Sequence, residues 1–246
     1  MVAKSIIDIN ADLGEGSGND AEIMPYISSC NIACGGHYGT DESMRETIRL
    51  AKDHQVSVGA HPSFPDTDNF GRKLLTLTKD ELTETIFNQL LHFFAVCETE
   101  AMPIHHIKLH GALYNYAAID APTADAVVEA IIATKVRPKL YLPFNSVLHR
   151  KAENLIPLVF EAFIDRRYTN DLQLVPRAHS EAIIRSPQKA WEQLWRMVSE
   201  KKVTTIQGNE LSIEASTFCI HGDHEGSVQL LKHIHSKLQE HKIKLA

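Results

Sequence analysis

The sequence lacks the long apolar run that a membrane span needs, since no stretch of its 246 residues approaches roughly 18 consecutive apolar residues. Its first ten residues, MVAKSIIDIN, carry one lysine and do not have the pattern of a signal peptide. The four cysteines are too few for a disulfide framework in a chain of this length. These absences predict a reduced, cytoplasmic protein without a membrane partner.

The common nucleotide-phosphate motifs are missing as well. No G-x-G-x-x-G follows the first apolar segment, and no G-x-x-x-x-G-K-[ST] occurs in the chain. There is no G-x-S-x-G nucleophile elbow either. The net charge of −6 is spread along the chain, which argues against nucleic acid as a partner. Without a nucleophile motif, the sequence favours chemistry by a bound anion or an activated water over chemistry through an acyl-enzyme.

Short apolar segments alternate with amphipathic stretches from end to end. Thr78 with Glu81 predicts a capping box, and Ser186 with Pro187 predicts another helix start. The alternation, without a Gly/Ser-rich linker, predicts a single domain over residues 1–246 on a parallel sheet. At this length a TIM-like β/α barrel is favoured, and an open doubly wound sheet is the alternative. The predicted strands are SIIDIN, SCNIAC, VSVGAH, HIKLHG, PKLYLP, PLVFEAFID and TFCIHGD.

Polar side chains follow nearly every predicted strand at its C-terminal end. In the first, NADLGEG is interpreted as breaking the strand, because Asn, Asp and Glu are depleted in strands. A barrel gathers its active site at this rim from separate strands, so we expect one shared site. The residues are Asn10, Asp12, Glu15, Asn31, His37, His61, Arg72, Lys108, His110, Asn115, Asp165, Arg166, Arg167, His221 and Asp223.

The residue types suggest roles at this rim. Histidines and carboxylates supply acid–base catalysis near neutral pH, and arginines bind carboxylate or phosphate groups through two prongs. The catalytic candidates are Asp12, His61, His110, Asp165, His221 and Asp223. The candidates for binding substrate are Asn10, Glu15, Asn31, His37, Arg72 and Arg166. Whether a metal is held stays open, and Asp12 with His37 and His61 is one two-histidine, one-carboxylate combination.

Six motifs together resemble the LamB/YcsF family, from Asp8 to Asp223. They are DINADLGEG, NIACGGH, GAHPSFPDTDNFGR, KLHGALYN, EAFIDRRYTNDLQLVPR and FCIHGD. The resemblance implies a seven-stranded β/α barrel similar to the glycoside hydrolase/deacetylase superfamily. Members of the family include the A subunit of prokaryotic 5-oxoprolinase, a hydrolase that opens 5-oxoproline to glutamate. The resemblance also implies that ATP takes part, with Mg²⁺ as its usual counter-ion, together with partner subunits B and C. It adds Arg177 to the candidates for binding substrate.

The chain departs from the family pattern at Gly36, Thr40, Leu109 and Leu172. We expect Gly36 to widen the pocket beside His37 and Thr40 to remove a helix cap or a ligand contact. Two other functions stay open: a stand-alone metal-dependent deacetylase or amidohydrolase, and a non-catalytic subunit that binds substrate. The sequence also leaves open whether ATP binds this chain or its partners, and whether the chain forms a homo-oligomer.

Overall fold

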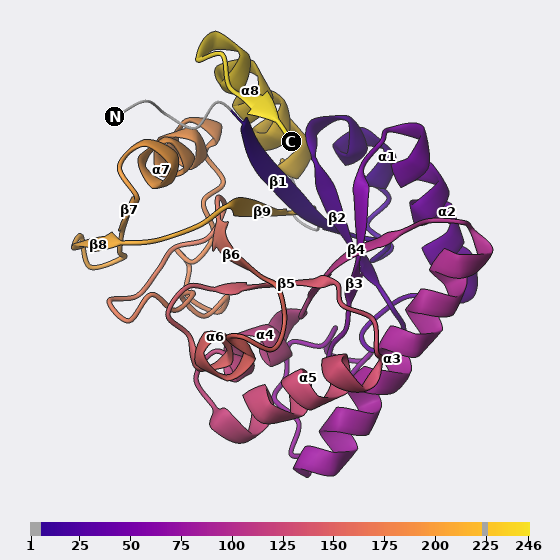
Figure 1. The fold of residues 1–246 in the computed structure, drawn as a ribbon. Helices are drawn as coiled ribbons and strands as arrows, with labels where there is room; N and C mark the ends of the chain where they lie inside the picture. Colours follow the sequence, from indigo (N-terminus) through magenta and orange to yellow (C-terminus); the bar gives the residue numbers. More distant parts are fainter. Residues whose placement is uncertain (1–5, 223–225) are drawn as a thin grey trace.

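Seven parallel strands close into a barrel in the computed structural model, which describes residues 6–222 and 226–246 (Figure 1). The barrel closes because β9 pairs with β6 on one side and with β1 on the other. All seven strands predicted from the sequence are present, so the barrel is confirmed and the open sheet is excluded. They are β1 (Ile6–Leu13), β2 (Ser29–Ala33), β3 (Ser57–His61), β4 (Ile104–Lys108), β5 (Lys139–Pro143), β6 (Leu158–Phe163) and β9 (Thr217–His221).

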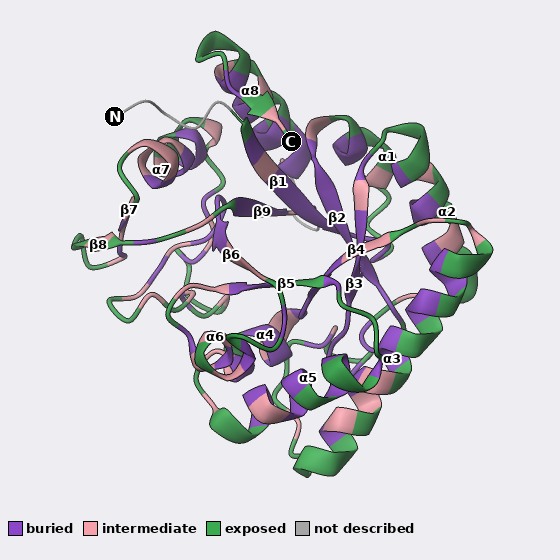
Figure 2. Cartoon of the chain, in the orientation of Figure 1, coloured by how far each residue is buried: buried purple, intermediate pink, exposed green. Residues whose placement is uncertain are grey.

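Helices surround the barrel in chain order, with buried inner faces and exposed outer faces (Figures 1 and 2). Thr78 and Ser186 cap α3 and α7 as predicted, each accepting a hydrogen bond from the backbone N–H three residues on. The helices are α1 (Asp20–Ile23) with the 3-10 helix η1 (Met24–Tyr26), α2 (Asp41–Asp53), α3 (Lys79–Thr99), α4 (Gly111–Ala117), α5 (Ala121–Ala133), α6 (Val147–Ala152), α7 (Pro187–Ser199) and α8 (Ser227–Glu240). In the described part of the chain, no helix is both long and apolar enough to cross a membrane.

One small strand pair and one further short strand lie outside the barrel. The antiparallel pair β7 (Lys202–Thr204) and β8 (Glu210–Ser212) follows α7, and β10 (Lys244–Leu245) extends the sheet beside the start of β1. The connection over residues 164–186 is irregular, as the sequence predicts. It is held by isolated bridges between Arg166 and Ile183 and between Tyr168 and Leu174. This connection returns over the C-terminal end of the barrel and brings its arginines to the rim.

The prediction that NADLGEG breaks the first strand is only partly right, because NADL continues β1 and the strand ends before GEG. β1 continues to Leu13, and its side chains alternate between two environments. Ile7 and Ile9 belong to the apolar core, whereas Asn10 and Asp12 hydrogen-bond to residues of other strands. Asp12 contacts Lys108 on β4, which is not a neighbour of β1, so the contact crosses the barrel interior. The alternating polar residues therefore line the inside of the barrel, where partners offset their low strand propensity.

The structure shows the surroundings of the four departures from the family pattern. The expectation that Thr40 removes a helix cap is wrong, because Thr40 itself caps α2 in a capping box with Ser43, whereas the loss of a ligand contact at Thr40 stays a prediction. A side chain at Gly36 would collide with Gln89 and Ser63, so these side chains fill the space that we expected to widen the pocket. Leu172 has φ 57°, a region that favours glycine. Leu109 is buried and lines the rim cavity.

Candidate active site inside the barrel

The lower layer of the barrel interior is a hydrogen-bond network of polar side chains from several strands. Asn10 Nδ2 donates to Glu161 Oε1 at 2.9 Å and to Thr217 Oγ1 at 2.7 Å. Asn31 Nδ2 donates to Asn10 Oδ1 at 2.8 Å, and His106 lies 2.6 Å from Asn31 Oδ1 through Nε2. Burial lowers the pKa of His106, so its ring is neutral and donates this bond. Asn10 and Asn31, predicted to touch substrate, therefore lie beneath the cavity and support the residues above them.

Above this layer, Asp12 and Lys108 form an ion pair in the centre of the barrel. Lys108 Nζ donates to Asp12 Oδ1 at 2.5 Å and contacts Cys219 Sγ at 3.1 Å, and Asn31 Nδ2 also donates to Oδ1 at 2.8 Å. Burial opposes ionisation of Asp12, but His61 and Lys108 outweigh it and hold the pKa of Asp12 well below its usual range. Burial also opposes the charge of Lys108, yet Asp12 raises its pKa well above the usual value. Asp12 is thus an ionised carboxylate whose second oxygen, Oδ2, faces the rim.

Glu161 is a second buried carboxyl group in the interior, 3.7 Å from Lys108 Nζ. Burial raises its pKa to about 7, although the attraction of Lys108 and the hydrogen bond from Asn10 act in the opposite direction. The ammonium of Lys108 lies nearer to Asp12, so it favours ionisation of Asp12 over that of Glu161. Near pH 7 the interior therefore holds one ionised carboxylate and one carboxyl group that takes up a proton readily.

The raised pKa of Glu161 predicts a pH-dependent stability. The folded state holds this proton up to about pH 7, whereas the unfolded chain releases it near about pH 4.3. The contribution is therefore fully present below about pH 4.3 and is lost as the pH rises through 7, by about 4 kcal/mol in total in the free energy of unfolding, of which about 3 kcal/mol falls between pH 5 and pH 8. Urea unfolding of the wild type and of Glu161→Gln at pH 5 and pH 8 measures it. The buried histidines, whose pKa values are lowered, change the stability in the opposite direction in both proteins, so the expected result is a difference of about 3 kcal/mol between the two pH dependences. The surface variant Glu129→Gln is the control and should behave as the wild type. If the stability of Glu161→Gln changes between pH 5 and pH 8 by as much as that of these two proteins, the assignment is contradicted.

The rim above Asp12 is a cluster of three histidines and one further carboxylate. His61 Nε2 lies 3.4 Å from Asp12 Oδ2 and 2.9 Å from His110 Nδ1. The turn after β1, with Gly14 at φ 69°, directs Glu15 toward His37, whose Nε2 lies 2.9 Å from Glu15 Oε1. Burial lowers the pKa of His61, and it lowers that of His37 to about 4. The sequence correctly placed these residues at one rim, and the structure brings them into direct contact.

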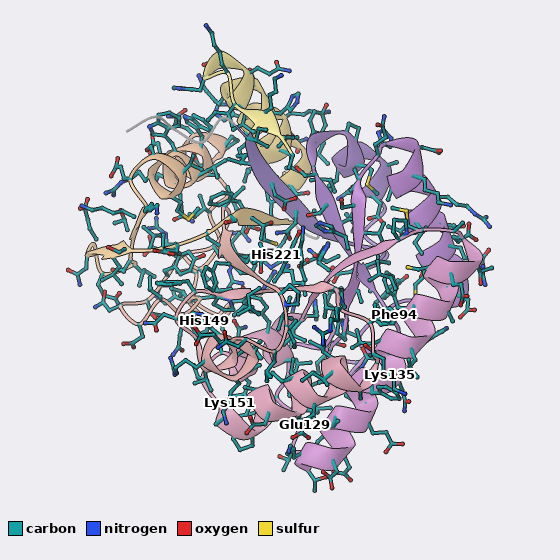
Figure 3. The ribbon with its side chains drawn as sticks, viewed as in Figure 1. Phe94, Glu129, Lys135, His149, Lys151 and His221 are labelled. Atoms are coloured by element: carbon teal, nitrogen blue, oxygen red, sulfur yellow. The ribbon has the colours of Figure 1, made fainter. Side chains whose placement is uncertain are left out.

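A second acid–histidine pair lies at the ends of β6 and β9. His221 Nδ1 contacts Asp165 Oδ2 at 2.9 Å, and the His221 backbone N–H donates to the same oxygen at 3.1 Å. The pair holds the His221 ring stacked on Phe163, with its centroid 5.3 Å away, and Figure 3 shows His221 near the middle of the ring of strands. The last predicted catalytic residue, Asp223, falls outside the described residues.

A cavity of about 400 Å³ opens above these side chains at the C-terminal end of the barrel. Asp12, His110 and His221 border it, and three arginines line it from two segments. Ligand cavities of this size are typical for small molecules. The arginines are Arg72 from the connection after β3, and Arg166 and Arg177 from the 164–186 connection. Of the other predicted residues, Glu15, His37, His61 and Asp165 are buried beneath the cavity wall.

Sequence reasoning missed part of the interior. Lys108 was counted as a rim residue without a role, and His106 and Glu161 were not singled out as site residues. Lys108 and His106 could have been found from the sequence, because polar residues alternate along this strand as they do along β1. The two sets are His106, Lys108 and His110, and Asp8, Asn10 and Asp12. Glu161 stands alone within the apolar segment LVFEAF, so nothing in its neighbours marks it as part of a polar interior.

Comparisons with known proteins agree on one family. The sequence profile of the LamB/YcsF family matches residues 7–246. The chain is 40% identical over 239 residues to the A subunit of 5-oxoprolinase from Symbiobacterium thermophilum, covering 95% of this chain and 92% of that protein. It is 39% identical to the protein of the same name from Staphylococcus carnosus, covering 97% of each chain.

Solved structures show the same relationship and the wider fold. The lactam utilization protein from Thermus thermophilus superposes with a TM-score of 0.90 at 36% identity, covering 98% of each chain. A family 4 carbohydrate esterase from Streptomyces lividans superposes with a TM-score of 0.52 at 10% identity, covering 99% of this chain and 93% of the esterase. The second comparison supports the barrel fold alone.

Proposed function

The chain belongs to the LamB/YcsF family, and on this basis we propose that it is the A subunit of an ATP-dependent 5-oxoprolinase. The observation that carries the proposal is the near full-length match to proteins that bear this name. The site agrees in its chemistry, because a small cavity combines an ionised carboxylate, histidines and arginines. We propose that it acts with partner subunits B and C, since the chain contains neither common nucleotide-phosphate motif.

The proposed reaction opens an amide that is a poor electrophile. Transfer of the γ-phosphoryl group of ATP to the lactam oxygen makes the ring carbon open to attack by water. The ring C–N bond then breaks as the nitrogen takes a proton, leaving an acyl phosphate that a second water hydrolyses to glutamate and phosphate. Asp12 Oδ2 and the neighbouring His61 and His110 rings are placed to orient the attacking water.

The arginines are assigned to the anionic groups of the substrate. Arg166 is buried, its Nη2 donates to the carbonyl oxygen of Val175 at 2.6 Å, and its side chain borders the cavity. Arg72 lies with its guanidinium 4.8 Å from the centre of the Phe70 ring. Both are therefore held in fixed orientations, which suits a planar contact with a carboxylate or a phosphate.

Arg72→Lys and Arg166→Lys are each expected to lower kcat/KM although the positive charge remains. Lysine is a point charge that cannot make the two-pronged contact, and one lost charge-assisted hydrogen bond costs about 1.5–3 kcal/mol, or about 10- to 100-fold. Steady-state kinetics of the assembled enzyme measure the effect. Arg49→Lys, on the surface of α2, is the matched control. Normal kinetics in both cavity variants would remove these residues from the substrate site.

Reconstitution tests the proposed function. The chain is purified alone and together with candidate B and C subunits, and 5-oxoproline-dependent ATP hydrolysis and glutamate release are measured. We expect both products from the complex and no appreciable glutamate from the isolated chain. Robust ATP-dependent glutamate release by the chain alone contradicts the need for partners, and a complex that releases no glutamate contradicts the proposed reaction.

A further inference from the structure

We propose that Asp12, His61 and His110 bind a divalent transition-metal ion at the barrel rim. Both histidine rings are hydrogen-bonded on their outer sides. His61 Nδ1 lies 2.8 Å from the carbonyl oxygen of Lys108, and His110 Nε2 lies 2.9 Å from the carbonyl oxygen of Phe70. A carbonyl only accepts, so both of these nitrogens carry the ring proton. In the neutral rings, His61 Nε2 and His110 Nδ1 are then left with lone pairs.

These two lone pairs point at each other. His61 Nε2 and His110 Nδ1 are 2.9 Å apart, a hydrogen-bond distance at which two unprotonated nitrogens would repel. Asp12 Oδ2 brings a third set of lone pairs 3.4 Å from His61 Nε2, while Oδ1 is occupied by Lys108 and Asn31. A proton on His110 Nδ1 would face His61 Nε2 and also Glu15 Oε1, 3.3 Å away, but it would leave Asp12 Oδ2 facing His61 without a donor. A cation between the three atoms satisfies Asp12, His61 and His110 together.

The arrangement has the features of a metal site. Histidine ligands usually donate their second N–H to a carbonyl or carboxylate, which fixes the tautomer, and both rings do so here. With metal–nitrogen bonds of about 2.1 Å, ligands at right angles lie about 3.0 Å apart and tetrahedral ligands about 3.4 Å apart. The observed separations of 2.9 Å and 3.4 Å span this range. Two imidazoles and one carboxylate leave positions open toward the cavity and favour a transition metal over Mg²⁺ or Ca²⁺.

A competing set of ligands lies beside it, made of Glu15, His37 and His110. His37 Nε2 is 2.9 Å from Glu15 Oε1, and His37 Nδ1 is buried without a hydrogen-bond partner among the described residues. A proton on Nε2 satisfies Glu15 directly and leaves only an acceptor unpaired, so His37 needs no ion. This assigns the ion to Asp12, His61 and His110 and makes His37 a neighbour that orients Glu15.

Metal binding by the isolated full-length chain tests the proposal independently of the lactam reaction. The chain is stripped with a chelator and titrated calorimetrically with Zn²⁺, Mn²⁺ and Co²⁺, with Mg²⁺ as the comparison ion. Bound metal is counted by mass spectrometry, and the Co²⁺ form is studied by visible absorption. We expect one tightly bound transition-metal ion per chain, weak binding of Mg²⁺, and ligand-field bands from nitrogen and oxygen ligands.

Variants decide which residues hold the ion. His61→Asn and His110→Asn should each weaken binding by more than the roughly 10- to 100-fold that an outer-shell change costs. His37→Asn and the surface variant His92→Asn should stay within about 10-fold, with circular dichroism confirming that each variant is folded. Wild-type protein that binds no stoichiometric metal overturns the proposal. Metal binding that survives in His61→Asn also overturns it, and binding that is lost in His37→Asn at the same time would assign the ion to the other set of ligands. Neither result changes the expectation for glutamate release by the complex.

Discussion

Replacement of Asp12 by Asn should lower the turnover of the assembled enzyme by about 10²-fold or more, the scale of general acid–base catalysis. The carboxylate is held ionised in the centre of the barrel, with Oδ2 directed at His61 and the cavity above it. Asn keeps the shape of the side chain but cannot carry its negative charge. Single-turnover glutamate release, normalised to the folded fraction of this chain, measures the chemical step.

The structure changes one part of this expectation. Asp12 is also the nearer counter-ion of buried Lys108, so Asp12→Asn leaves the ammonium with Glu161, 3.7 Å away, as its remaining carboxyl partner and should unfold more readily than a variant of a turn residue would. Turnover is therefore compared at a temperature where circular dichroism shows the variant folded. Asp125→Asn, which removes a surface partner of Lys151, is the control. Near-normal turnover of folded Asp12→Asn would exclude Asp12 from the chemistry.

Replacement of Lys108 by Met should lower the free energy of unfolding by about 3–5 kcal/mol, the range for breaking a buried pair from one side. Lys108 is 1% exposed, donates to Asp12 at 2.5 Å and lies 3.7 Å from Glu161. Methionine leaves Asp12 as an uncompensated charge in the barrel interior. Urea unfolding at pH 7 gives the difference from the wild type.

A double variant separates the charge from the packing. Asp12→Asn combined with Lys108→Met removes both charges, so it should be more stable than Lys108→Met alone. Lys79→Met, which breaks a surface pair with Glu129, should have little effect. A Lys108→Met protein as stable as the wild type would show that the interior ion pair does not contribute to the fold.

The barrel could be predicted because its signals are local. Each strand is a short apolar segment with a polar end, and the caps at Thr78 and Ser186 depend on neighbouring residues alone. The rim location of His61, His110 and His221 follows from the same pattern, because parallel strands in a barrel end on one side. Strand ends therefore predicted the correct neighbourhood of the site.

The interior could not be predicted because it depends on closure of the barrel. Asp12 in an open strand would be exposed, and only the ring of strands brings Lys108 to its carboxylate from across the interior. The same closure turns Asn10 from a strand breaker into a hydrogen-bonded interior residue. His61 contacts His110 at hydrogen-bond distance, whereas His37 contacts Glu15. These contacts depend on the orientations of the histidine rings, which the spacing of the residues in the sequence does not predict.

The central claim is that the lactam is opened inside this barrel, and locating the bound lactam tests it most directly. A structure of the assembled complex with 5-oxoproline and a non-hydrolysable ATP analogue would show where the ring lies. We predict the lactam in the cavity bordered by Asp12, His110 and the arginines Arg72, Arg166 and Arg177, with its reacting carbon facing Asp12 and His61. A lactam bound only within the partner subunits, with this cavity unaltered, would contradict the claim.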